Sequence, residues 1–132
     1  MRNVITDEKS LVVACENGQL DVVKHLVAHG ADVHVNSDES IAQACAHGHL
    51  DIVIFLIDHG VDLHTNDEEP LVRACAGGQL EVVKYLIGHG ANVHANNDEP
   101  IIKACAHGHL DVVVYLIEHG VDLHTNDEEP LV

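Results

Sequence analysis

The sequence predicts an all-α solenoid of stacked helix-turn-helix units, and three observations predict it. The chain of 132 residues repeats itself every 30 residues without gaps. Each repeat contains two short runs of apolar residues at the spacing i, i+3 and i+4, which places them on one face of a helix. Glycine recurs at two fixed positions in each repeat, where it suits the residue that follows the end of a helix.

The period also predicts the domain organisation. The segment VDLHTNDEEPLV at 61–72 recurs letter for letter at 121–132. A single helix pair of this size cannot bury its own apolar face, whereas stacked copies bury each other's faces. We therefore expect one domain over 1–132. Its repeats are 1–30, 31–60, 61–90 and 91–120, and a partial repeat follows at 121–132.

The first helix of each repeat is predicted from a column of small and aliphatic residues, such as Leu71, Ala74 and Cys75. Its start can be read in two ways. One column of short polar residues suits the N-cap position. The helix can instead begin at the proline a few residues later, because the residue before proline resists helical angles. The column comprises Asp7, Ser37, Asp67, Asn97 and Asp127, and the prolines are Pro70, Pro100 and Pro130.

The second helix is predicted from a single apolar stripe, Leu20, Val23, Leu26 and Val27 in the first repeat. A glycine after each helix then ends it in a left-handed residue. Between the second helix and the next repeat lies a short polar tract, which we expect to be a connecting loop.

Composition and charge exclude several classes of partner. The chain is 46% hydrophobic and only 2% aromatic, so its core must be aliphatic. The net charge of −16 repels phosphate backbones and anionic membranes, which argues against nucleic acid and membrane partners and favours a basic protein surface. No apolar run has the length of a transmembrane helix, and the start lacks a signal-peptide pattern. We expect a cytoplasmic protein.

The segment EPLVRACAGGQLEVVKYLIGHGANVH resembles an ankyrin repeat, and the likeness covers essentially the whole chain. The phrases GHLDVV and DLHTNDE are similar to the ankyrin arrays of giant DNA viruses, which implies the host cytoplasm. The family period is about 33 residues. The shortfall here lies between His64 and Pro70, so the projecting hairpin of the family should be shortened. Glu69 and Val72 replace the family's Thr and His in its Thr-Pro-Leu-His signature.

Cysteine and histidine columns suggest structural roles. Equivalent cysteines in stacked helices lie too far apart for a disulfide, and no Cys-x-x-Cys pair suggests zinc. We therefore expect Cys15, Cys45, Cys75 and Cys105 to be buried. Histidines before the capping glycine and in the loops are expected to make local hydrogen bonds. The pairs His47 and His49, and His107 and His109, are weak metal candidates, so we predict no metal and no cofactor.

No catalytic set emerges, which favours a non-enzymatic protein–protein interaction scaffold that binds on its concave face. The resemblance implies partner-facing positions on the first helices and at the ends of the second helices. Residues that vary between repeats extend this set. The implied positions are Ala46, His47, Ala76, Gly77, Ala106, His107, His59, His89 and His119, and the varying ones are Gln43, Arg73, Lys103, Val35, Thr65 and Ala95.

Two alternatives stay open at this point. One is a structural or designed array without a natural partner. The other is an adaptor fragment of a larger viral or host-interaction protein. Leu131 and Val132 would begin an apolar stripe that nothing follows. End-to-end self-association through this uncapped end is therefore also expected.

Overall fold

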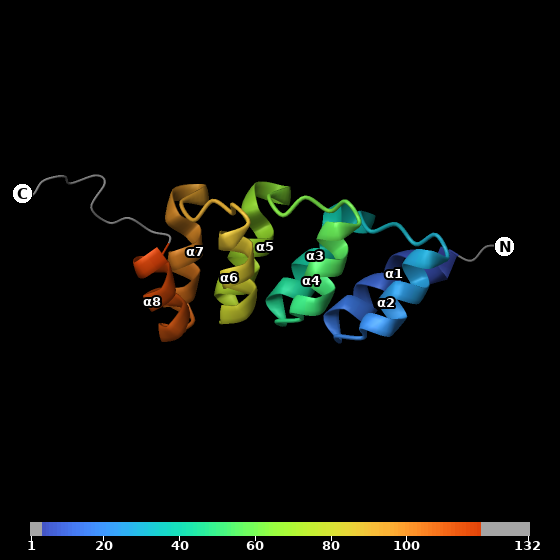
Figure 1. The fold of residues 1–132 in the computed structure, drawn as a ribbon, viewed down its shortest axis with the longest axis horizontal. Helices are drawn as coiled ribbons and strands as arrows, with labels where there is room; N and C mark the ends of the chain where they lie inside the picture. The colour runs from blue at the N-terminus through green and yellow to red at the C-terminus, as the bar shows by residue number, and fades with distance from the viewer. Residues whose placement is uncertain (1–3, 120–132) are drawn as a thin grey trace, which may run out of the picture.

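The computed structural model describes residues 4–119 as a row of helix pairs, with no strand among these residues (Figure 1). Each pair falls within one predicted repeat, and a tight turn joins its two helices. The pairs are α1 Val4–Glu16 with α2 Leu20–Ala28, α3 Val35–Ala46 with α4 Leu50–Asp58, α5 Thr65–Ala76 with α6 Leu80–Gly88, and α7 Ala95–Ala106 with α8 Leu110–His119.

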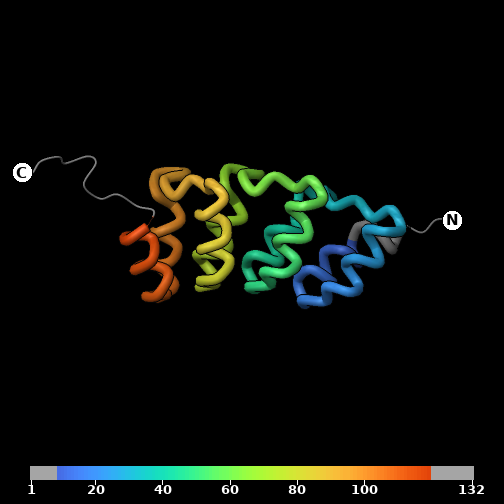
Figure 2. The backbone as a smooth tube through the Cα atoms, viewed as in Figure 1, coloured from blue at the N-terminus to red at the C-terminus, as the bar shows by residue number. Residues whose placement is uncertain are grey.

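The helices form two layers along the solenoid (Figure 2). The first helices, α1, α3, α5 and α7, pack closely against one another in sequence. The second helices form the other layer and touch their neighbours less extensively. The tight turns lie along one edge of the row, and the longer connections between pairs lie along the opposite edge.

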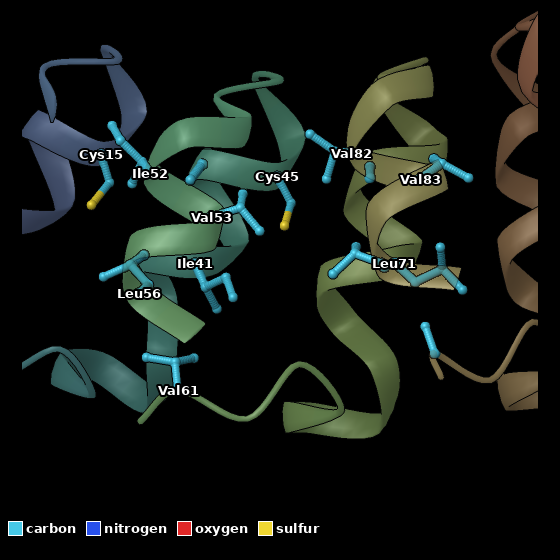
Figure 3. Packing of buried hydrophobic residues seen from close by; sticks show 14 of the residues in the cluster. Cys15, Ile41, Cys45, Ile52, Val53, Leu56, Val61, Leu71, Val82 and Val83 are labelled. Atoms are coloured by element: carbon cyan, nitrogen blue, oxygen red, sulfur yellow. The ribbon is translucent and has the colours of Figure 1, made fainter. Parts of the chain in front are cut away.

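The core consists of the predicted apolar stripes. Leu71, Ala74 and Cys75 of α5 are fully buried, as are Val83 and Leu86 of α6. Figure 3 shows such side chains filling the spaces between successive helix pairs. The predicted aliphatic core is therefore confirmed. Only Phe55, Tyr85 and Tyr115 add aromatic rings, each partly buried at its edge.

The cysteine prediction is confirmed for three of its four members. Cys15, Cys45 and Cys75 are free and buried. Cys105 is free but exposed, so its predicted burial is wrong. The physical reason is its position in α7, where no described helix pair packs against the face that covers the other three cysteines.

The N-cap prediction is wrong for Ser37, Asp67 and Asn97, which lie in the first turns of α3, α5 and α7. A capping residue has extended backbone angles. Ser37, Asp67 and Asn97 instead have φ values of 58°, 57° and 59°, and the residues on either side of each are left-handed too. Asn and Asp tolerate this conformation better than most residues. One left-handed turn therefore precedes each regular helix, which begins beside the predicted proline in α5 and α7 and beside Ser40 in α3.

A ladder of side-chain hydrogen bonds links each repeat to the one before it. His49 Nε2 lies 3.0 Å from the carbonyl oxygen of Glu16, and Gln79 Nε2 donates to the carbonyl of Ala46 at 3.0 Å. His109 Nε2 completes the series at 3.0 Å from the carbonyl of Ala76. Each bond satisfies a carbonyl at the end of a first helix, which has no partner within the helix.

Candidate partner-binding cleft

A cleft of about 360 Å³ runs between α5 and α7 on the side formed by the first helices. None of its lining residues comes from α6 or α8. Asn66, Asp67, Glu69, Val72, Arg73 and Ala76 line one wall, and Asn96, Glu99, Lys103 and His107 line the other.

A connected set of polar side chains shapes the α5 wall. The Arg73 guanidinium donates to Glu69 Oε2 through Nε at 3.1 Å and lies 3.0 Å from it through Nη2. Asn66 Nδ2 donates to Glu69 Oε1 at 3.2 Å and to the carbonyl of Ser37 at 2.7 Å. These bonds hold the guanidinium and the carboxylate in place, because each group is fixed at two points.

The α7 wall repeats part of this arrangement. Asn96 Nδ2 donates to Glu99 Oε1 at 2.9 Å and to the carbonyl of Asp67 at 3.3 Å. Lys103 lies one helical turn beyond Glu99, as Arg73 lies beyond Glu69. The cleft therefore presents three carboxylates, those of Asp67, Glu69 and Glu99, and two cations, Arg73 and Lys103.

The cleft brings together four of the predicted site residues, namely Arg73, Lys103, Ala76 and His107. In the second repeat the same positions hold Gln43 and Ala46 on α3 and His47 directly after it. Gln43 Nε2 donates to Glu39 Oε2 at 3.0 Å, which mirrors the Arg73 pair. Gln43, Arg73 and Lys103 are half-buried.

Other predicted residues have different surroundings. Val35 and Ala95 are buried at the starts of α3 and α7, which leaves little of either side chain for a partner to contact. Thr65, their counterpart in α5, is half-buried and donates its hydroxyl to Asp38 Oδ2 at 2.6 Å. Gly77 lies so close to the carbonyl of Ala46 that a Cβ atom would collide with it. Ala106 is exposed beside the cleft.

The histidine column His59, His89 and His119 does not line the cleft. Each ring lies at the end of a second helix, where its Nδ1 hydrogen bonds to the carbonyl four residues earlier, for example to Phe55 at 2.8 Å. The same ring packs against the aromatic side chain at that position, with centroids 4.0 Å apart for Phe55 and His59. These histidines therefore stabilise the ends of the second helices.

The loop histidines make the local hydrogen bonds predicted for them. His34, His64 and His94 place Nδ1 at 2.7, 2.6 and 2.7 Å from a carboxylate four residues later. These carboxylates belong to Asp38, Glu68 and Asp98, each the last residue of a left-handed turn. The pairs therefore fasten the shortened loops.

Neither the thiols nor the His-x-His pairs form a reactive centre among residues 4–119. Burial raises the pKa of Cys15 and of Cys75 to about 12, which keeps both thiols protonated. Burial also raises the pKa of Cys45. His49 and His109 are engaged in the inter-repeat ladder. Within this range no group of three His, Cys, Asp or Glu side chains gathers as metal ligands do.

Sequence reasoning missed Asn66, Glu69, Asn96 and Glu99 as cleft residues. A signal for them was present. The glutamates precede Arg73 and Lys103 by four residues, the spacing at which opposite charges meet on a helix. Asparagine occupies the same position of the second, third and fourth repeats. Neither column was predicted as part of the site.

Comparison with known families matches the chain to ankyrin repeats, described as a unit of three copies, over residues 3–67 and 41–127. No curated protein matches the chain. Over residues 4–119, every helix is too short or too polar to cross a membrane. The described helix pairs recur at the 30-residue period over residues 4–119, which lie within the matched region.

Proposed function

The chain belongs to the ankyrin-repeat family, and on that premise we propose that it binds a protein partner along its first helices, centred on the cleft between α5 and α7. The family generally forms protein–protein interaction modules and is typically a non-enzymatic scaffold. The cleft is the observation that carries the more specific proposal. A cytoplasmic location and a relationship to viral arrays remain predictions.

The cleft favours a folded or extended protein surface over a small ligand. It is open and crosses two repeats, and its polar groups come from both walls. Solenoid proteins use such continuous faces to contact large partners. Glu69 and Glu99 offer carboxylates to donors on the partner, and Arg73 and Lys103 offer donors to its acceptors.

The net charge of the whole chain favours partners with a basic surface. With a net charge of −16, the protein attracts a basic surface and repels nucleic acid. The Arg73–Glu69 pair on one wall, with Lys103 and Glu99 on the other, then sets the register of the partner, because a misplaced partner would oppose like charges. Binding to a basic partner should weaken as salt concentration rises.

The test compares two double variants that each remove two positive charges. Arg73→Ala with Lys103→Ala alters the cleft, whereas Lys24→Ala with Lys84→Ala alters exposed positions on α2 and α6. Proteins bound by the wild type are identified by affinity capture and cross-linking from the source cells. The proposal requires a partner that is retained by the second variant and lost by the first.

Cross-links should also fall within the cleft walls. A partner that both variants recover equally, or whose cross-links lie on the second helices, would contradict the proposed face. Circular dichroism of both variants checks that the helices remain formed.

A further inference from the structure

The two ends of the described stack expose opposite halves of the junction that joins one repeat to the next. At the first repeat, Val22 of α2 is 45% exposed. Its counterparts Ile52, Val82 and Val112 are at most 1% exposed, because the preceding repeat covers each of them. A hollow of about 420 Å³ lies beside Val22. We call this surface the leading face, and it includes Val13, Ala14, Gln19 and Val22.

The fourth repeat exposes the complementary half. Leu110 of α8 is 73% exposed, whereas Leu20, Leu50 and Leu80 pack against the core. Cys105 is exposed, although the cysteines at its position in the earlier repeats are buried. We call this surface the trailing face, and it includes Ile102, Cys105, Leu110 and Ile117.

The polar ladder is incomplete at both ends in matching ways. Gln19 is exposed, whereas Gln79 at its position in the third repeat donates to the carbonyl of Ala46. A Cβ atom added to Gly48 would collide with that Gln79 side chain, but one added to Gly108 would meet nothing within 4 Å. The space beside Gly108 is therefore the space that a glutamine fills beside Gly48.

From these three observations we infer that the leading face of one molecule binds the trailing face of a second copy, head to tail. Gln19 of the second copy then lies beside Gly108 and donates to the carbonyl of Ala106. Val22 is covered as Ile52, Val82 and Val112 are covered within the chain. The occupant is a copy of this chain because the contact continues an interface that the chain already forms three times.

The order of residues along the chain supports this occupant. The ladder residue alternates Gln19, His49, Gln79 and His109. A glutamine that follows His109 continues the alternation, and the leading face supplies one. Two leading faces or two trailing faces would instead place like halves of the junction together, which leaves the ladder carbonyl without a donor.

The test uses the full chain and three variants that each add one negative charge. Val22→Glu disables the leading face, and Leu110→Glu disables the trailing face. Ala28→Glu is the matched control, because Asp58 and Glu118 occupy its position in the second and fourth repeats. Sedimentation velocity is measured over a range of concentrations at moderate salt, which screens the repulsion between acidic copies.

We expect the wild type and Ala28→Glu to form longer species as concentration rises, and each face variant alone to stay monomeric. An equimolar mixture of Val22→Glu and Leu110→Glu should form dimers and nothing larger. Each such dimer joins the one intact leading face to the one intact trailing face. The mixture also shows that both variants are folded, because each must contribute a working surface.

Two results would overturn the inference. A wild type that is monomeric at every concentration would favour residues 121–132, which repeat 61–72, as the cover of the trailing face. Association that Val22→Glu abolishes and Leu110→Glu leaves unchanged would show that leading faces pair with each other. Neither result would bear on partner binding through the cleft between α5 and α7, which is tested separately.

Discussion

At the scale of single residues, the glycine before each ladder residue and the donor of the next repeat form one structural unit. Gly78 has φ +70°, and the His109 ring occupies the space where its Cβ would lie. Gly108 has almost the same backbone angle, φ +74°, with open space beside it. The two positions therefore differ only in whether a neighbouring side chain is present.

This difference predicts unequal costs for the same substitution. Gly108→Ala should lower the free energy of unfolding by about 1–2 kcal/mol, the cost of a left-handed alanine. Gly78→Ala should cost about 1 kcal/mol more, because it also displaces the His109 bond to the Ala76 carbonyl. Urea denaturation of both variants measures the difference. Equal losses would show that the ladder bond adds nothing to stability.

At the scale of elements, each first helix combines a predictable face with an unpredictable start. The buried stripe of α5 follows from the helical spacing of Leu71, Ala74 and Cys75, so sequence alone was sufficient. The left-handed turn before it was not predictable in the same way. Asn66, Asp67 and Glu68 suit a helix N-terminus as well as they suit a left-handed turn, and only packing against the previous loop decides.

The residues of the cleft also divide into those that the sequence predicts and those that it does not. Arg73 and Lys103 were predicted because they vary between repeats, and His107 was predicted because the family resemblance implies its position. Asn66 and Asn96 were missed because their amides act across repeats, on the carbonyls of Ser37 and Asp67. A contact between residues 29 positions apart depends on the pitch of the solenoid, which the sequence does not state.

The buried thiols of the first helices predict that stability falls at alkaline pH. Their usual pKa is 9.0, and burial raises the pKa of Cys15 and Cys75 to about 12. Above pH 9 the unfolded chain loses these protons while the folded chain keeps them. The unfolded state therefore becomes more stable relative to the folded state. Each of these two thiols should lower the free energy of unfolding by about 1.4 kcal/mol per pH unit between pH 9 and 12.

Urea denaturation at pH 8 and pH 10 measures this loss. Cys75→Ala removes one of the titrating thiols, so its stability should fall less between the two pH values than that of the wild type. Cys105→Ala is the control, because Cys105 is exposed and its replacement should leave the difference unchanged. The same pH dependence in all three proteins would refute the assignment.

At the scale of the whole molecule, negative charge opposes the apolar ends. The net charge is −16 with every histidine neutral, and protonation of all 13 histidines would bring it to −16 + 13 = −3. Histidine takes up its proton between about pH 8 and 5. Lowering the pH therefore removes most of the repulsion between copies while it leaves the leading and trailing faces unchanged.

We expect the mean mass of the wild type in light scattering to rise as the pH falls from 7 towards the isoelectric point near 4.9. The mean mass of the Val22→Glu variant should rise much less, because reduced charge cannot restore its leading face. A wild-type mass that is constant over this range would contradict the prediction. An equal rise in both proteins would indicate unspecific precipitation.

The alternation of glutamine and histidine in the inter-repeat ladder bears on how the array changes length. A 60-residue stretch can be inserted or removed at any junction while a glutamine repeat still follows a histidine repeat. The duplicated segments at 61–72 and 121–132 are separated by this interval. Recombination within the gene in steps of two repeats would therefore lengthen or shorten the binding surface and keep the order of the ladder residues.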